Sequence, residues 1–500
     1  MRNITVSIRE DSRAAFSNNA AFCIGTGRMG LALQQEYQEQ LRAVQALCGF
    51  QHIRGHGLFC GDMSIYQPYK DAEGVEHEAY CFTYLDRVMD SYRAAGLRPF
   101  LELGFMPDQI ASGEQTIFYW KGNVTPPKDE AKWVNLVTAT LVHLKERYGE
   151  EEVSAWPCEV WNEPNLPGFW QNADKDAYLR LYEITAHAVK SVLPTMPVGG
   201  PAICGGEGSQ GWIRDFLAFC EQKALPVDFV SRHAYMGLAP EHRGRYLYHG
   251  MRTVDDLLAE MKESRDIIDS FPRYRGLPMH ITEFNTSDNP FCPIPDTALN
   301  AATIAGLLAR LGEVAASYSY WTFGDVFEEQ GVPPTPFHGG FGLMANGLIA
   351  KPTLWTFNFF NNLQGECVYK DEHLVLTRRK DGSFEGVAWN LCEHGEDDDL
   401  VIELRLPGRG AHALLTRTVD DDHGNPLPLW LKMGQPASLT GEQLSFLREA
   451  AQPYCAAQAV AEEDGALVAR LTLKKNAVAH IRVTASEAKP DYGYDPGMYL

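Results

Sequence analysis

The sequence predicts an α/β protein that consists of a (β/α)8 barrel, the TIM barrel, with a C-terminal antiparallel β-sandwich. Between residues 20 and 330, short β-rich segments alternate with longer segments of helical periodicity, a pattern typical of βα units around a parallel sheet. After about residue 355 the pattern changes to short strands separated by turns. The chain has 500 residues, enough for a barrel of about 250 residues and a second domain.

The barrel prediction rests on a succession of eight candidate strands. They are residues 21–27, 51–58, 98–105, 158–162, 196–202, 228–234, 278–284 and 317–323. In the first intervening helix, apolar residues recur at spacings of four and three from Leu33 to Cys48, and Gly49 follows as a stop signal. Eight such units in sequence favour a closed barrel over an open doubly wound sheet.

The C-terminal part has the pattern of an antiparallel sandwich. Its candidate strands are residues 374–377, 384–389, 400–406, 467–473 and 478–483. The first two flank a Lys380-Asp381-Gly382 turn, which predicts a hairpin. Apolar and polar residues also alternate over residues 4–8, so this segment can add a strand to the same domain. We therefore assign residues 14–350 to the barrel, and residues 1–13 with 351–500 to the sandwich.

Composition and charge exclude several classes of protein. Lys and Arg number 44 against 65 Asp and Glu, and the resulting net charge of −21 repels nucleic acids and anionic membrane surfaces. No apolar stretch approaches the length of about 18 residues that a membrane span needs. The N-terminus lacks a signal-peptide core, and the 11 cysteines form no C-x-x-C pair, so we expect a cytoplasmic protein. The sequence leaves the oligomeric state open, a homo-oligomer included.

Polar residues gather where predicted barrel strands end. The fourth strand runs into Trp161-Asn162-Glu163-Pro164-Asn165, and the seventh into Ile281-Thr282-Glu283-Phe284-Asn285. Because the carboxyl ends of all strands meet at one face of a barrel, Glu163 and Glu283 should converge there. Cleavage of a glycosidic bond needs one carboxylic acid to protonate the leaving oxygen and a second carboxylate to stabilise or attack the developing cation. The pair therefore predicts a glycoside hydrolase.

The residues around this pair fit the same chemistry. Asn162, His233, Tyr235 and Trp321 also lie at the carboxyl ends of predicted strands or directly after them. The acid has to hold its proton near neutral pH while the second carboxylate stays ionised. Repulsion between close carboxylates raises the pKa of one, and a hydrogen bond from a neighbour such as Tyr235 keeps the pKa of the other low.

These motifs resemble the clan A glycoside hydrolases, and more closely the β-xylosidases of glycoside hydrolase family 39. Besides the two Glu motifs, the resemblance runs through Gly25-Thr26-Gly27-Arg28, Arg54-Gly55-His56-Gly57, Phe105-Met106-Pro107, Phe118-Tyr119-Trp120-Lys121-Gly122-Asn123-Val124-Thr125-Pro126-Pro127, Gly199-Gly200-Pro201-Ala202, Ser231-Arg232-His233-Ala234-Tyr235 and His338-Gly339-Gly340-Phe341-Gly342. It covers the whole barrel in order and is weaker over the tail.

The resemblance implies a retaining, exo-acting enzyme that removes β-D-xylose from the non-reducing ends of small xylo-oligosaccharides by double displacement. It makes Glu163 the general acid/base and Glu283 the nucleophile, with no cofactor and no metal. The residues implied to bind the sugar hydroxyls are His56, Asn162, His233 and either Glu328 or Glu329, with Tyr235 beside them. The residues implied to form the apolar walls are Phe118, Phe169 and Trp321, although packing in the core would explain these aromatic residues equally well.

Two other classes of function can be weighed against a hydrolase. Residues 25–30 match G-x-G-x-x-G, the fingerprint of dinucleotide-binding oxidoreductases, but no Asp or Glu occurs between Gln40 and Gly61 to bind a ribose. We therefore attribute these glycines to the first strand-to-helix turn. Metal ligation is not indicated, because His77-Glu78 lacks the second His of H-E-x-x-H. A non-catalytic sugar-binding barrel would not need two convergent Glu residues.

Within the family, the main rival is an activity of the α-L-iduronidase type. An iduronate carboxylate calls for a cationic clamp, for which Arg28, Lys121 and Arg232 are the candidates. The match to the xylosidase motifs favours a neutral pentose instead. The preference among xylosides, arabinosides and related pentosides depends on pocket volume, which the sequence does not determine.

Overall fold

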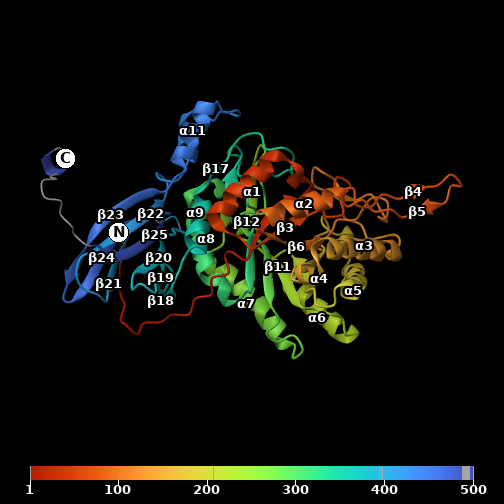
Figure 1. The fold of residues 1–500 in the computed structure, drawn as a ribbon, viewed down its shortest axis with the longest axis horizontal. Helices are drawn as coiled ribbons and strands as arrows, with labels where there is room; N and C mark the ends of the chain where they lie inside the picture. The colour runs from red at the N-terminus through yellow and green to blue at the C-terminus, as the bar shows by residue number, and fades with distance from the viewer. Residues whose placement is uncertain (1, 207, 394, 396–397, 487–495, 499–500) are drawn as a thin grey trace.

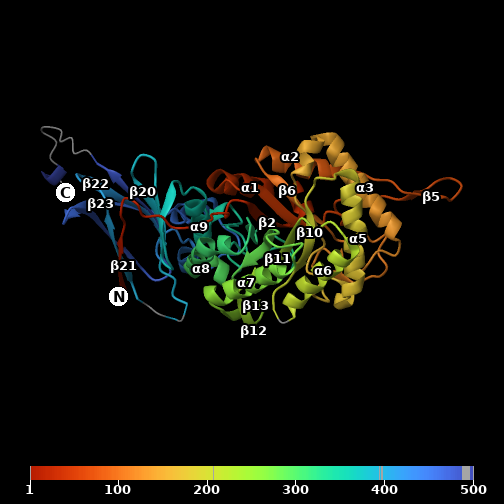
Figure 2. The same cartoon turned by 90° about the horizontal axis from the view of Figure 1, so that it is seen from below.

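The computed structural model has a barrel and a sandwich, which lie side by side along the longest axis of the molecule (Figures 1 and 2). It describes residues 2–206, 208–393, 395, 398–486 and 496–498. The eight barrel strands are β2 (Cys23–Arg28), β3 (His52–His56), β6 (Arg98–Leu103), β9 (Cys158–Val160), β10 (Val198–Ile203), β11 (Phe229–Tyr235), β14 (Met279–Asn285) and β15 (Ser317–Tyr320). They close in the order β10-β11-β14-β15-β2-β3-β6-β9, so the predicted (β/α)8 barrel is confirmed.

Helices surround this barrel. The α-helices are α1 (Gln35–Cys48), α2 (Thr83–Ala94), α3 (Glu130–Tyr148), α4 (Glu150–Ser154), α5 (Lys175–Val192), α6 (Ser209–Lys223), α7 (Val254–Ser270), α8 (Ala298–Arg310) and α9 (Pro352–Asn361). The predicted first helix ends at the expected stop, since Gly49 adopts a left-handed conformation with φ of 62°. α9 follows residue 350 and packs against α8 and α1, in the outer layer of the barrel.

Short elements complete the barrel half of the chain. The 3-10 helices are η1 (Met29–Leu33), η2 (Gln171–Ala173), η3 (Ile294–Asp296) and η4 (Leu311–Glu313), and η5 (Pro496–Met498) lies near the C-terminus. The hairpin strands are β4 (Tyr69–Lys70), β5 (Glu76–His77), β7 (Thr116–Ile117), β8 (Gly122–Asn123), β12 (Gly237–Arg243), β13 (Tyr246–Met251), β16 (Met344–Ala345) and β17 (Ile349–Ala350). The β4–β5 hairpin extends away from the barrel (Figure 1).

The sandwich is one sheet that curls into two layers. Its strands are β1 (Arg2–Ser7), β18 (Glu366–Lys370), β19 (Leu374–Arg378), β20 (Phe384–Trp389), β21 (Leu400–Leu406), β22 (His412–Val419), β23 (Tyr454–Glu463), β24 (Ala466–Leu473) and β25 (Val478–Ala485). β23 joins the layers, because residues 454–460 pair with β22 and residues 461–463 pair with β24. Apolar side chains of both layers meet in one core, which includes Val6, Leu376 and Leu404. The C-terminal sandwich is therefore confirmed.

Three strands and two helices of the tail were not predicted. They are β18, β22, β23, α10 (Leu427–Lys432) and α11 (Gly441–Ala450). In β23 the exposed run Tyr454-Cys455-Ala456-Ala457-Gln458-Ala459 shows no apolar alternation, because neither face of this stretch covers the core. β1 pairs with β21 in parallel orientation, in contrast to the antiparallel neighbours in the rest of this sheet.

The barrel and the sandwich share α8. This helix is apolar on all sides, with eleven buried residues among its thirteen. It packs against α7 and α9 on the barrel side and against β20 and β25 of the sandwich. Its composition follows from this position, since a helix covered all round has no polar face. No helix among the described residues is long and apolar enough to cross a membrane.

A buried lysine at the start of α9 fixes the loop that precedes it. The ammonium group of Lys351 lies 2.6 Å from Asp296 Oδ1 and 2.7 Å from Asp325 Oδ2, and it donates a 2.7 Å hydrogen bond to the carbonyl of Gly340. The same two carboxylates accept hydrogen bonds from the backbone N–H groups of Gly339 and Gly342. The network holds residues 338–342 at the mouth of the barrel.

We expect Lys351→Met to lower the free energy of unfolding by about 3–5 kcal/mol, because it leaves two buried carboxylates without their cation. The matched control is Lys262→Met, which removes a lysine exposed on α7 and should change stability by less than about 0.5 kcal/mol. Unfolding transitions of both variants and the wild-type protein measure the difference. Equal transitions for the two variants would contradict the stabilising role of the Lys351 network.

Candidate active site

Glu163 lies in a sharply turned segment directly after β9. Trp161 and Glu163 both have positive φ, 71° and 45°, a conformation that is uncommon for residues other than glycine and is concentrated at functional sites. The N–H of Glu163 donates to the carbonyl of Ala202 at 2.9 Å, which ties the turn to the end of β10. The turn thus presents the carboxyl group of Glu163 at the carboxyl ends of the barrel strands.

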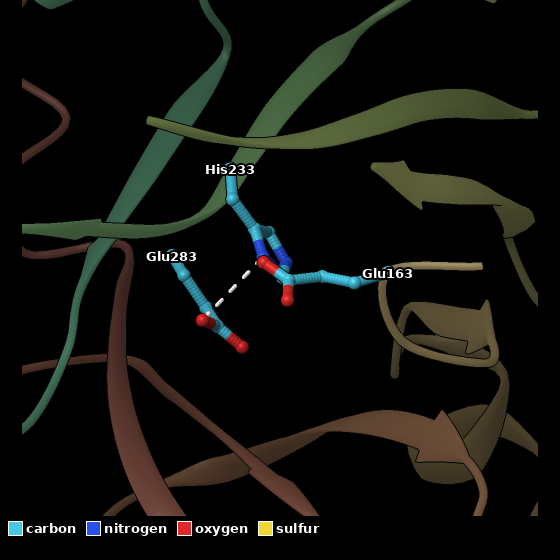
Figure 3. Close-up of side chains that lie close together, drawn as sticks. All are labelled: Glu163, His233 and Glu283. Atoms are coloured by element: carbon cyan, nitrogen blue, oxygen red, sulfur yellow. Dashed lines mark hydrogen bonds and ion pairs between the residues drawn. The ribbon is translucent and has the colours of Figure 1, made fainter. Parts of the chain in front are cut away.

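Glu163, His233 and Glu283 converge from three different strand ends (Figure 3). His233 Nδ1 lies 2.7 Å from Glu163 Oε1 and 3.4 Å from Glu283 Oε2. One nitrogen or oxygen atom from each of the three residues lies within 4.8 Å of the others, and all three residues are buried. The structure therefore brings together the two carboxylates that the strand-end motifs predict.

Glu283 is held by two donors. Arg54 Nη1 donates to Glu283 Oε1 at 2.7 Å, and the hydroxyl of Tyr235 donates to Glu283 Oε2 at 2.6 Å. Burial, and then the charge of Glu283, raise the pKa of Tyr235 well above its ordinary value, so its hydroxyl keeps the proton that it donates. Arg252 in turn donates to the carbonyl of Tyr235 at 2.6 Å. Both oxygens of Glu283 are thereby oriented and stabilised as a carboxylate.

Arg54 connects most of the charged groups below the site. Its Nε donates to Glu159 at 2.6 Å, and its Nη2 donates to Asn162 at 2.9 Å and lies 3.0 Å from Glu102. These carboxylates outweigh the effect of burial and raise the pKa of Arg54, whereas burial raises the pKa of Glu159. The sequence motifs did not assign Arg54, Glu102 or Glu159 to the site. The feature of the sequence that could have indicated them is a charged residue inside an otherwise apolar strand.

The two groups that face each other beside Glu283 are both held in their neutral forms. Burial and then the charge of Glu283 raise the pKa of Glu163 well above its ordinary value. Burial, followed by the charge of Arg54, lowers the pKa of His233 well below its ordinary value. Glu163 is therefore a carboxylic acid over a wider pH range than an exposed glutamate, and His233 is neutral near pH 7.

A cavity of about 380 Å³ opens above these groups. Its lining residues are His56, Ile117, Phe118, Asn162, Glu163, Leu166, Phe169, Cys204, Tyr235, Glu283, Asp288, Pro290, Trp321, Glu329, Gln330 and Phe341. The rings of Phe118 and Phe169 contact edge to face at 5.4 Å, and Trp321 lies 4.6 Å from the ring of His56. The predicted aromatic walls thus line the cavity.

The structure shows which of two adjacent glutamates faces the cavity, a question that the sequence left open. Glu329 lines the cavity, where burial and then Glu283 raise its pKa well above the ordinary value. Glu328 points elsewhere and accepts a hydrogen bond from Arg28 at 2.6 Å. His56 is held by Glu102, whose carboxylate lies 2.6 Å from Nδ1. His233 does not line the cavity, since its ring lies against Glu163.

Two of the three glycines of the G-x-G-x-x-G motif lie in a strand, whereas Gly30 lies in η1, in the expected connection between β2 and α1. Gly25 and Gly27 lie within β2, and a Cβ atom at Gly25 would come within 2.6 Å of the ring of Trp321. At Gly27 it would come within 2.9 Å of the ring of Phe327. Glycine is needed here because aromatic side chains from the last strand region pack directly on the backbone of the first.

A divalent cation has three candidate ligands in this site. Glu163, His233 and Glu283 have the spacing of a metal site. However, Glu163 and His233 are hydrogen-bonded to each other, and Arg54 already supplies a positive charge to Glu283. The geometry thus describes a carboxylic acid beside an ionised carboxylate, which is the arrangement that glycosidic bond cleavage requires.

A barrel with two close carboxylates at the ends of β9 and β14 defines a glycoside hydrolase. The sequence model of "Glycosyl hydrolases family 39" matches residues 3–468, and the chain belongs to this family. The chain is 47% identical over 500 residues to a Beta-xylosidase of Geobacillus stearothermophilus, with 98% of each chain covered. It is 32% identical to a Beta-xylosidase of Caldicellulosiruptor saccharolyticus, with 86% of this chain and 88% of the relative covered.

Solved structures agree with this assignment. The crystal structure of the GH39 enzyme from Xanthomonas axonopodis pv. citri superimposes with a TM-score of 0.87 at 30% sequence identity. The superposition covers 97% of this chain and 98% of the other. The likeness extends over the barrel and the sandwich together, and the resemblance to family 39 that the motifs indicate is confirmed.

We expect Tyr235→Phe to lower kcat/KM by about 10- to 100-fold, because it removes a hydrogen bond to a carboxylate worth about 1.5–3 kcal/mol. The fold and the cavity wall remain, since only the hydroxyl group is lost. Tyr248→Phe, on the exposed face of β13, is the matched control and should be as active as the wild-type enzyme. Full activity in Tyr235→Phe would show that Glu283 does not depend on this donor.

Proposed function

We propose that the protein is a retaining, exo-acting β-xylosidase that releases β-D-xylose from the non-reducing ends of small xylo-oligosaccharides. The observation that carries the retaining mechanism is the short distance between oxygen atoms of Glu163 and Glu283, at most 4.8 Å. Retaining enzymes have carboxyl groups about 5–5.5 Å apart, whereas inverting enzymes leave about 6.5–9.5 Å for a water molecule. The relatives that are named Beta-xylosidase, one of them 47% identical, support the sugar.

In the first step Glu163 protonates the leaving oxygen and Glu283 attacks the anomeric carbon, which forms a glycosyl–enzyme ester. Arg54 and Tyr235 hold the attacking carboxylate in one orientation. Esterification removes the charge of Glu283, and with it one of the causes that raise the pKa of Glu163. Glu163 then ionises and acts as the base that activates water in the second step.

The residues that line the cavity fit a neutral sugar better than a uronic acid. Among its lining residues in the described chain there is no Lys or Arg. Two of the three candidate cations for an iduronate carboxylate are engaged elsewhere: Arg28 pairs with Asp62 and Glu328, and buried Arg232 pairs with Glu260. The third, Lys121, is exposed and does not line the cavity. An iduronate carboxylate would instead face Glu329 and Asp288, which line the same cavity.

We place this activity in the cytoplasm. All 11 cysteines lie in the described part of the chain and are free thiols there, which fits a reducing compartment. Substrates in that compartment are short oligosaccharides rather than polymeric xylan, in agreement with exo action. His56, Asn162, Tyr235 and Glu329 are the polar groups that we assign to the sugar hydroxyls, with Phe118, Phe169 and Trp321 as apolar walls.

A panel of aryl glycosides that differ only in the sugar tests the substrate. We expect rapid hydrolysis of the β-xyloside, and NMR spectra of the first product should show β-xylose before mutarotation. Xylotriose should release xylose stepwise from one end. An α-xylose product would overturn the retaining mechanism, and strong hydrolysis of the iduronide with none of the xyloside would overturn the substrate.

Two variants separate the roles of the carboxylates. Glu283→Ala should abolish glycosyl–enzyme formation for every substrate, whereas Glu163→Ala should still be glycosylated by a substrate with an acidic aryl leaving group. On poor leaving groups each variant should lose at least three powers of ten in rate, about 4 kcal/mol at about 1.4 kcal/mol per tenfold.

Added azide identifies which side chain is missing. It needs no base, so in Glu163→Ala it should restore turnover and give the β-glycosyl azide by double displacement. In Glu283→Ala it should occupy the space of the lost carboxylate and give the α-glycosyl azide by single displacement. If the two variants gave azides of the opposite anomeric forms, the roles of Glu163 and Glu283 would be exchanged.

A further inference from the structure

Cys204 is the one thiol among the lining residues of the described cavity, and it lies directly after β10. Cys204 and Glu163 line the same cavity, and the thiol is near enough to the carboxyl group of Glu163 for each group to shift the pKa of the other as a hydrogen-bond partner. Other cysteines of the barrel, such as Cys158 and Cys220, are packed in the apolar core instead. Cys204 therefore occupies a place where a thiol contacts a reacting group.

The backbone holds Cys204 and Glu163 in a fixed relation. The side-chain amide of Asn165 accepts a 2.9 Å hydrogen bond from the N–H of Cys204 and donates a 3.0 Å bond to its carbonyl. The N–H of Glu163 donates to Ala202 at 2.9 Å. Three hydrogen bonds thus join the segment 163–165 to the segment 202–204, so the backbones that carry the thiol and the carboxyl group are held side by side.

The direction of the hydrogen bond follows from the surroundings of the thiol. Burial raises the pKa of Cys204, and the charges of Glu163, Asp288 and Glu283 raise it further. The thiol therefore stays protonated over the working pH range and donates its proton to Glu163. A donor favours the ionised form of a carboxyl group and opposes the effects of burial and Glu283 on Glu163.

We propose that Cys204 is a positioning residue for the acid/base: its thiol orients the carboxyl group of Glu163 toward the cavity and stabilises its ionised form, which the second step needs. The inference rests on the proposed function of Glu163. It means that a residue at the end of β10 influences the proton transfers that Glu163 carries out.

Several charged and titratable groups surround the same carboxyl group. They are Glu283 from β14, Asp288 from the loop after it, His233 and Tyr235 from β11, Arg54 from β3 and Glu329 from the loop after β15. Each of these bears a charge or contacts the sugar or Glu283. Cys204 is uncharged, so its replacement alters the hydrogen bond to Glu163 and leaves the net charge of the cavity unchanged.

The inference predicts the direction of a change in the pH profile. The alkaline limb of kcat/KM reports the deprotonation of the acid in the free enzyme. Without the thiol, the ionised form of Glu163 loses a donor and its pKa rises, so the alkaline limb moves to higher pH. A weak hydrogen bond from a thiol to a carboxylate corresponds to a shift of about half a pH unit.

The test compares Cys204→Ala, which removes the donor, with Cys204→Ser, which keeps one. Profiles are measured with xylobiose, whose leaving group needs protonation. We expect the alkaline limb of Cys204→Ala to move up by about half a unit and that of Cys204→Ser to lie at or below the wild-type position. Cys220→Ala, a buried thiol on α6 away from the cavity, is the matched control and should keep the wild-type limb.

A second control separates this inference from the proposed function. Glu163→Gln should lose the alkaline limb altogether; if it kept the limb, the assignment of Glu163 as the acid would fail. If Glu163→Gln behaves as expected but the limbs of Cys204→Ala and Cys204→Ser coincide, or if both shift like Cys220→Ala, the role of Cys204 is refuted. Circular dichroism and thermal unfolding of each variant show whether the fold is retained.

Discussion

The site depends on one buried guanidinium. Arg54 places a single positive charge among Glu102, Glu159 and Glu283 and also bonds the amide of Asn162. Three carboxylates without a cation could not all remain ionised in a buried site, because desolvation and mutual repulsion would favour their protonated forms. The charge of Glu283 and the orientation of the β9 turn are thus both consequences of a residue that never reaches the substrate cavity.

Glu283 is a carboxylate and Glu163 a carboxylic acid because their side chains have different hydrogen-bond partners. Arg54 and Tyr235 each bond one oxygen of Glu283, whereas Glu163 faces a neutral imidazole and a thiol. Two identical side chains therefore receive different donors from their neighbours. Burial then increases the effect of each donor, because interactions in a site closed to water are less screened. The fold creates an acid and a nucleophile from one residue type by the placement of polar neighbours.

Much of this arrangement was predictable from sequence, because strands of a parallel barrel are apolar runs and functional residues follow their carboxyl ends. All eight barrel strands and the convergence of Glu163 with Glu283 follow from that rule. Arg54 and Glu159 did not, since a charge inside a strand has no partner until the barrel closes. Glu328 and Glu329 also could not be separated, because loop geometry decides which neighbour faces the cavity. β23 could not be predicted either, because apolar and polar residues do not alternate in its exposed part.

The parallel pairing of β1 with β21 has a consequence for synthesis of the chain. Arg2 lies opposite Leu400 in that pair, so β1 has no partner until the chain has been made as far as β21, about 400 residues later. At about 5–20 residues per second, this delay lasts tens of seconds, during which the barrel can fold as a unit. The strand edge stays open meanwhile, and such edges are prone to pair with other chains. The sandwich can therefore close only after β21 and the strands that follow it, β22 to β25, have been made.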